Sequence, residues 1–133
     1  MMSVPSPTGY AFNRTRHAYL ATRLIIAGTH WSRLRGLLGT DAEEFVAGNG
    51  LWIVPCRGVH TFAMSFPIDV LYLNGSKVVV HVEENLKPWR MARISLQAAS
   101  VLELPSQSLR SSGTMVGDEI EIELGQAREM SRA

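Results

Sequence analysis

Residues 68–82 read IDVLYLNGSKVVVHV, and this stretch decides the fold class. β-branched and aromatic side chains recur at every second position of 68–73, which is the period of a β-strand. Residues 77–82, KVVVHV, have the same composition. Asn74 and Gly75 lie between the two runs, and both residue types tolerate the positive φ of a tight hairpin turn. The stretch therefore predicts two antiparallel strands joined by an Asn-Gly turn.

Further short strands are predicted on both sides of this hairpin. The pattern is clearest in EIEIEL, where glutamate alternates with isoleucine or leucine along the whole run. The predicted strands outside the hairpin are 18–27 (AYLATRLIIA), 51–54 (LWIV), 100–104 (SVLEL) and 119–124 (EIEIEL). They do not alternate regularly with helices, so a doubly wound α/β fold is disfavoured.

Helical periodicity is confined to two places. Residues 29–39, THWSRLRGLLG, place one tryptophan and three leucines on a single helical face, which predicts one short helix near residues 30–38. Residues 106–113 have room for one further helical turn, which Gly113 can end. The predicted fold is mainly β, with α+β at the margin: a compact β-barrel or a jelly-roll-like sandwich.

Length and composition predict one domain. The chain has 133 residues, 46% of them hydrophobic and 19% charged, which is typical of a single globular domain. Prolines and glycines interrupt any periodicity before Ala18. We therefore expect a flexible basic leader over 1–17, a β domain over 18–125 and a polar tail over 126–133.

Charge and cysteine content limit the possible partners. The first 40 residues carry five arginines and no acid, whereas the rest carries eight basic and twelve acidic residues. Lys and Arg are not interleaved with aromatic residues, so nucleic-acid binding is disfavoured. The single cysteine cannot form an internal disulfide. The N-terminal charges lack a following apolar run, and no segment is long enough to span a membrane, so a cytoplasmic protein is expected.

Several motifs resemble one known family. They are RLRGLLG (33–39), GLWIVPC (50–56), HTFAMSFPIDVLYLN (60–74), LKPWR (86–90), VLELP (101–105) and VGDEIEI (116–122). In this order they resemble the DUF192 family of uncharacterised bacterial and archaeal domains, from about residue 18 to 124. The resemblance implies a compact β-barrel or jelly-roll-like domain. It implies no reaction, because the family has none established.

Residues 54–69, VPCRGVHTFAMSFPID, concentrate the groups that could support chemistry. Cys56, His60 and Met64 are evenly spaced, and thiolate, imidazole and thioether ligands together suit copper. His30 could supply a fourth ligand. Residues four apart on a strand stand roughly 13 Å apart, so only a tight loop would gather them around one ion. Copper is therefore an alternative, and no other cofactor is predicted.

A nucleophilic cysteine is the second alternative. His60 could act as the base for Cys56, which would make the protein a Cys/His-dependent enzyme. Arg57 adjoins the thiol in sequence, but neighbouring residues on a strand face opposite ways. No third group that would orient the histidine is evident.

The third interpretation is a recognition surface, and it is the one we favour over an enzyme. His60, Thr61, Asp69, Trp89 and Arg90 lie in or beside segments outside the strand interiors. Trp and Arg are the residue types that most often anchor binding sites. We expect 54–69 and 86–90 to meet at one end of the barrel and form a polar cleft. The predicted function is a binding or accessory module for a small polar ligand or a protein partner.

Overall fold

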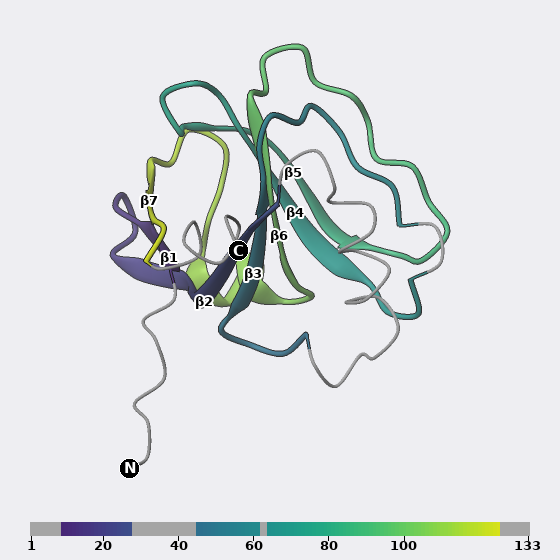
Figure 1. Ribbon diagram of the computed structural model, residues 1–133, viewed down its shortest axis with the longest axis horizontal. Coiled ribbons are helices and arrows are strands. Elements are labelled where there is room, and N and C mark those ends of the chain that lie inside the picture. The colour runs from purple at the N-terminus through teal and green to yellow at the C-terminus, as the bar shows by residue number, and fades with distance from the viewer. Residues whose placement is uncertain (1–8, 28–44, 62–63, 126–133) are drawn as a thin grey trace, which may run out of the picture.

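The fold is one curled β-sheet, seen in a computed structural model that describes residues 9–27, 45–61 and 64–125. Within these residues, seven strands lie in the order β5-β4-β6-β3-β2-β1-β7 (Figure 1). Their bounds are β1 (Gly9–Asn13), β2 (Ala18–Ala27), β3 (Asn49–Ile53), β4 (Ile68–Leu73), β5 (Val79–Leu86), β6 (Ser100–Pro105) and β7 (Ile120–Glu123). The described residues also contain the short helix α2 (Ser108–Ser112). The predicted mainly β fold is confirmed, and the helix predicted near 30–38 lies outside the described residues.

The central hairpin forms as predicted, but its turn is wider. β4 and β5 pair antiparallel. The amide of Lys77 donates to the carbonyl of Asn74 at 2.9 Å, and Lys77 itself adopts a left-handed φ of 61°. Oδ1 of Asn74 accepts hydrogen bonds from the amides of Ser76 and Val78 at 2.9 and 3.0 Å. The side chain of Asn74 therefore stabilises a three-residue turn in place of the expected two-residue Asn-Gly turn.

The ordered domain begins earlier than the sequence predicts. β1 lies within the expected flexible leader, and it pairs with both β2 and β7. Asn13 at its end is fully buried, and its Nδ2 donates to Asp118 Oδ2 at 2.9 Å. The prediction of a flexible leader is therefore wrong for Gly9–Asn13. The missed information is long-range, because β1 is stabilised by partners about one hundred residues away.

Both faces of the sheet centre are buried, and different elements cover them. On β4, Ile68, Val70 and Tyr72 pack in one hydrophobic cluster, while Leu71 and Leu73 pack in the other. The second cluster is completed by residues of β1, β2, β7 and helix α2. The first cluster is covered by the described residues of the connection between β3 and β4 and by the connection 87–99, through the buried residues Val59, Met64, Ala92 and Ala98. These two connections thus have an inner side that packs on the sheet and an outer side that is free to carry a site.

Candidate functional site

The two predicted site segments do meet, and Thr61 joins them. Thr61 is fully buried. Its Oγ1 donates to the carbonyl of Lys87 at 2.6 Å and accepts from the amide of Arg90 at 2.9 Å. Its amide donates to the carbonyl of Arg90 at 2.8 Å, and its carbonyl accepts from the amide of Trp89 at 2.9 Å. Thr61 is therefore an architectural residue that fixes the backbone of 87–90 against 54–61.

The same pairing continues beyond Thr61. His60 and Met91 form an isolated antiparallel bridge. The amide of Ala92 donates to the carbonyl of Val59 at 2.9 Å, and the amide of Ser95 donates to the carbonyl of Arg57 at 2.9 Å. The segment 87–95 is thus held by backbone hydrogen bonds over most of its length, although it belongs to no named strand.

Asp69 serves a different part of the molecule. It is 1% exposed, and its two carboxylate oxygens accept from the amides of Asn85 at 2.8 Å and Leu109 at 2.9 Å. The second bond satisfies an amide in the first turn of α2, the usual task of a capping carboxylate. Asp69 also lines a separate cavity of 120 Å³ with Glu84, Asn85 and Arg110. The polar cleft built around Asp69 therefore does not describe this site.

A shallow groove takes the place of the polar cleft. It measures 240 Å³ and runs between 57–60 and 91–94. Its lining is mostly apolar, with Gly58, Val59, Met91, Ala92 and Ile94 beside the side chains of Arg57 and His60. Of the five predicted site residues, only His60 lines this groove. An apolar lining favours contact with an apolar group over capture of a small polar ligand.

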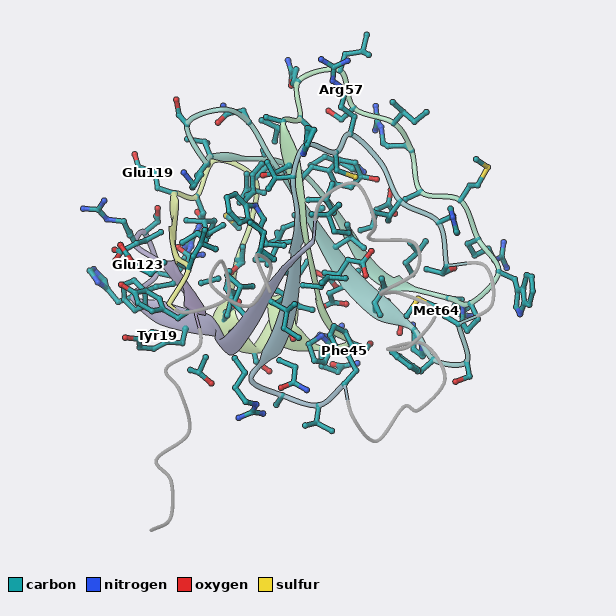
Figure 2. The ribbon with its side chains drawn as sticks, in the orientation of Figure 1. Tyr19, Phe45, Arg57, Met64, Glu119 and Glu123 are labelled. Carbon is teal, nitrogen blue, oxygen red and sulfur yellow. The ribbon has the colours of Figure 1, made fainter. Side chains whose placement is uncertain are left out.

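Beside the groove, the outer side of 87–96 is a row of exposed apolar side chains. Trp89 is 66% exposed, Met91 72%, Ile94 67% and Leu96 80%. Cationic residues alternate with them: Lys87, Arg90 and Arg93 are all exposed. Arg57 reaches the same side and lies at the outer edge of the molecule (Figure 2). We call these eight residues the ridge.

Trp89 adopts an unusual backbone conformation at the start of the ridge. Its φ is 63°, in the left-handed region that bulky side chains rarely occupy. Such a conformation costs roughly 1–3 kcal/mol and persists only where surrounding bonds over-determine it. The hydrogen bonds from the amides of Trp89 and Arg90 to Thr61 provide that constraint. The fold therefore stabilises a strained geometry that leaves a tryptophan exposed.

The proposed copper ligands are placed as follows. Met64 is 5% exposed and belongs to the core cluster, against which Cys56 also packs. The thiol of Cys56 donates to the carbonyl of Gly58 at 2.9 Å. His60 lines the groove described above, and His30 lies outside the described residues. Within the described ranges no three His, Cys, Asp or Glu side chains gather as a metal site. Copper binding through Cys56, His60 and Met64 stays a prediction.

The Cys/His enzyme also remains a prediction. Cys56 is partly exposed and lines an open hollow of 470 Å³ with Pro55, Arg57, Ala98 and Ala99. In its hydrogen bond to the carbonyl of Gly58 the thiol is the donor, whereas a nucleophilic thiolate would be the acceptor.

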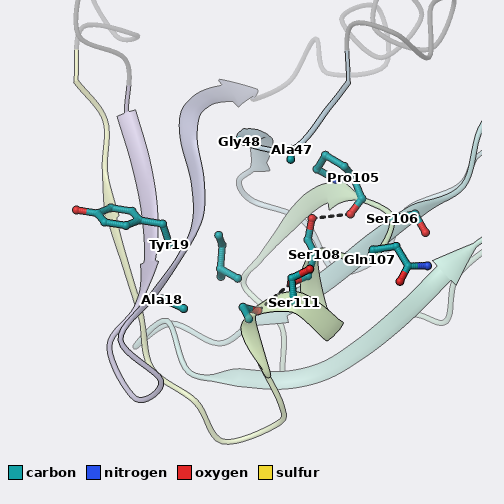
Figure 3. Close-up of a pocket in the computed structure, with 11 residues that line it drawn as sticks. Ala18, Tyr19, Ala47, Gly48, Pro105, Ser106, Gln107, Ser108 and Ser111 are labelled. Carbon is teal, nitrogen blue, oxygen red and sulfur yellow. Dashed lines mark hydrogen bonds between the residues drawn. The ribbon is translucent and has the colours of Figure 1, made fainter.

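Another cavity, of 270 Å³, lies between α2 and the start of β2 and is rich in serines (Figure 3). Three of its four serine hydroxyls are already engaged within the protein. Ser108 Oγ donates to the carbonyl of Pro105 at 2.6 Å, and Ser112 Oγ to the carbonyl of Ser108 at 2.9 Å. Ser106 Oγ donates to Asn85 Oδ1 at 2.9 Å. Among the described residues, those that line the cavity are all uncharged. It is therefore a weaker candidate than the ridge.

Sequence reasoning found Trp89 and Arg90 but missed most of the ridge. Met91, Ile94 and Leu96 follow neither a strand period nor a helix period, so periodicity could not assign them to a face. One signal was present in the chain. Residues 85–102 contain three basic residues, no acid and several large apolar residues. Acid-free apolar sequence in a predicted connection is the feature that could have identified the ridge.

Comparisons with known proteins concern fold and family. The DUF192 family, described as "Uncharacterized ACR", matches residues 11–122. A UPF0127 protein of Thermococcus sibiricus (strain DSM 12597 / MM 739) is 29% identical over 121 residues, which cover 87% of this chain and 76% of that protein.

Two solved structures share the fold. A protein of unknown function from Novosphingobium aromaticivorans DSM 12444 superposes with a TM-score of 0.67 at 16% identity, over 86% of this chain and 83% of that one. A candidate transcription regulator from Sinorhizobium meliloti 1021 superposes with a TM-score of 0.64 at 20% identity, over 91% and 96%. At these identities the likeness shows the fold alone.

Proposed function

The chain belongs to the DUF192 family, whose description names no activity, and we propose from its geometry that it is a docking module. It binds a larger partner through the ridge and does not turn over a substrate in a pocket. The observation that carries this proposal is the exposure of Trp89, Met91, Ile94 and Leu96, each above 60%, on one connection. Single exposed apolar residues are ordinary, but a contiguous set with cations beside it marks an interaction surface.

The backbone of the ridge is held by hydrogen bonds, and this supports the same function. Binding requires that the side chains and loops of an interface become ordered, and this ordering weakens affinity. In the ridge, the amides of Ala92 and Ser95 are already bonded to the connection on the other side of the groove. The carbonyl of Arg93 accepts from the hydroxyl of Tyr72, a fully buried core residue. The ridge is thus presented in one conformation before any partner arrives.

Photo-cross-linking in cells tests this function. Benzoylphenylalanine is incorporated at Leu96 or Ile94 in the full chain, and at Val116 as a matched control. Val116 is 56% exposed and lies in the connection before β7, away from the ridge. We expect a discrete adduct, to protein or to lipid, from the ridge positions only. A ridge that yields no adduct, or the same adducts as Val116, would contradict the docking function.

A further inference from the structure

We infer that the ridge docks on the anionic headgroups of a lipid membrane surface, an inference that rests on the docking function proposed above. The partner is identified by the chemistry of the ridge. A membrane interface combines negative charge, an accessible apolar layer and a broad, nearly flat shape. The ridge offers a complement to each of these properties.

Charge is the first property. The ridge carries four cations, Arg57, Lys87, Arg90 and Arg93. None of them takes part in an ion pair within the described part of the chain. The sequence contains no acid from Phe45 to Ile68 and none from Asn85 to Leu102, so both connections that form this face are purely basic. Basic clusters of this kind are attracted to anionic lipid headgroups.

The apolar side chains are the second property. Exposed Trp together with aliphatic side chains and Lys or Arg is the composition of segments that lie in a membrane interface. The indole of Trp89 suits the headgroup level, where the amphipathic ring is favoured. Met91, Ile94 and Leu96 are unbranched or aliphatic side chains that can enter the outer acyl region. They alternate with cations that remain at headgroup height.

Shape is the third property. The connection 87–99 runs along the outer edge of the molecule (Figure 1). Its groove is only 240 Å³ and lies beside the ridge, so most of the apolar surface projects outward. An outward row of side chains fits a flat surface better than it fits an extended peptide, which requires a groove or a free strand edge.

Other occupants fit less well. A second copy would bring two sets of four cations together, and like charges facing each other oppose association. Single-stranded nucleic acid is bound through aromatic platforms on which successive bases stack. The ridge contains one aromatic residue, Trp89, and its three other large apolar side chains have no role on a phosphate backbone.

Vesicle binding by the full chain tests the inference. The probes are sucrose-loaded phosphatidylcholine vesicles with and without one third phosphatidylglycerol, and binding is measured by sedimentation. We expect binding to the anionic vesicles only, with an affinity that falls at least tenfold between low and high salt because exposed charges are screened. Emission from Trp89 should shift to the blue and be quenched by brominated lipid. The Trp89→Phe variant should lose this signal while it still sediments.

Paired substitutions separate charge from apolar contact. R90S/R93S should bind about 25-fold more weakly, since each cation near an anionic surface is worth about fivefold. W89S/L96S should bind at least tenfold more weakly even at low salt. The control R110S/V116S removes one exposed cation and one exposed apolar residue near α2 and β7, and its binding should be unchanged. All three variants should keep the melting temperature of the wild type, since every substituted side chain is exposed.

The outcomes distinguish the inference from the function on which it rests. Absence of vesicle binding at low salt, or equal loss in the control variant, overturns the lipid partner. If Leu96 then cross-links to a protein in cells, the docking function stands and its partner is an acidic protein. If neither vesicles nor cross-links appear, both proposals are wrong.

Discussion

At two corners of the molecule a buried polar side chain fixes a connection to the rest of the fold, but the surfaces beside the two corners differ. At the Asp118 corner, a buried carboxylate ties β1 to the connection before β7. Its Oδ2 accepts from Asn13 Nδ2 at 2.9 Å, from Arg16 Nε at 3.0 Å and from the amide of Met115 at 3.1 Å. At the Thr61 corner, one buried hydroxyl ties 87–90 to 54–61.

The difference lies in what each corner holds in place. The polar groups of the Asp118 corner close the curled sheet. The carboxylate of Asp118 forms an ion pair with Arg16 there. The Thr61 corner instead holds a connection whose outer side is a row of exposed cations and exposed apolar residues. Buried polar residues thus indicate architecture in both corners. The docking surface that we propose is formed instead by the exposed apolar residues that the Thr61 corner holds in place.

The largest expected effect is at the Asp118 corner. Asp118→Ala removes the acceptor of three hydrogen bonds. It leaves the buried side-chain amide of Asn13 without one of its two acceptors. We expect a loss of about 3 kcal/mol in the free energy of unfolding, measured with urea. Glu119→Ala is the matched control, because that neighbouring side chain is exposed. Equal stability of the two variants would show that this corner does not close the sheet.

The same corner predicts an acid-sensitive stability. Burial alone would raise the pKa of Asp118, but hydrogen bonds from Arg16, Asn13 and Met115 outweigh it and lower the pKa below its ordinary value of 3.8. The stabilisation is therefore complete above about pH 4 and is lost as the pH falls through the lower folded pKa. Unfolding curves below pH 4 should converge for the wild type and Asp118→Ala. Curves that keep a constant separation would contradict this linkage.

The second effect is at the Thr61 corner. Thr61→Val keeps the shape of the side chain but leaves the amide of Arg90 and the carbonyl of Lys87 without their hydroxyl partner. A loss of about 2 kcal/mol is expected. Hydrogen exchange should accelerate at the amides of Trp89 and Arg90, and vesicle binding should weaken because the ridge is no longer held in one conformation. Thr61→Ser keeps the hydroxyl and should stay close to the wild type in all three measurements.

A smaller effect is expected where the core supports the middle of the ridge. Tyr72→Phe removes the hydrogen bond to the carbonyl of Arg93 and should cost about 1 kcal/mol. Burial, assisted by the charge of Glu83, raises the pKa of Tyr72 to about 12. The wild type should therefore lose stability as the pH rises from about 10, where the unfolded tyrosine ionises, towards that value. Alkaline urea titrations of the phenylalanine variant should lack this component; an unchanged alkaline decline would assign it to another group.

The smallest effect on folding is expected on the ridge itself. W89S/L96S replaces two side chains that are 66% and 80% exposed, so the free energy of unfolding should change by less than about 0.5 kcal/mol. Thermal and urea unfolding check this directly. A large destabilisation would mean that these side chains pack within the protein, and the contrast between the two corners would disappear.

Prediction from sequence succeeded where the signal was local. The strands at 18–27 and 68–73 were predicted with the bounds that the structure has, because alternation, flanking glycine and turn residues are all short-range information. The turn after Leu73 was predicted as two residues, since the sequence does not show that the side chain of Asn74 will bond two backbone amides. Asp69 was predicted to line a ligand cleft, whereas in the fold its carboxylate accepts from the amides of Asn85 and Leu109. A carboxylate at a strand start can serve a ligand or a distant helix, and only the position of α2 decides between them.

The sequence by itself determined that this chain is a mainly β domain with a central hairpin, and it singled out 54–69 and 86–90 as the unusual segments. It could do so because strand period and turn chemistry depend on neighbouring residues. Tertiary structure alone decided that β1 joins the sheet, that Asp69 and Thr61 are structural, and that Met91, Ile94 and Leu96 face outward beside Trp89. These outcomes depend on hydrogen bonds and packing between residues far apart in the chain. Such contacts exist only after the sheet has curled and its two connections have come together.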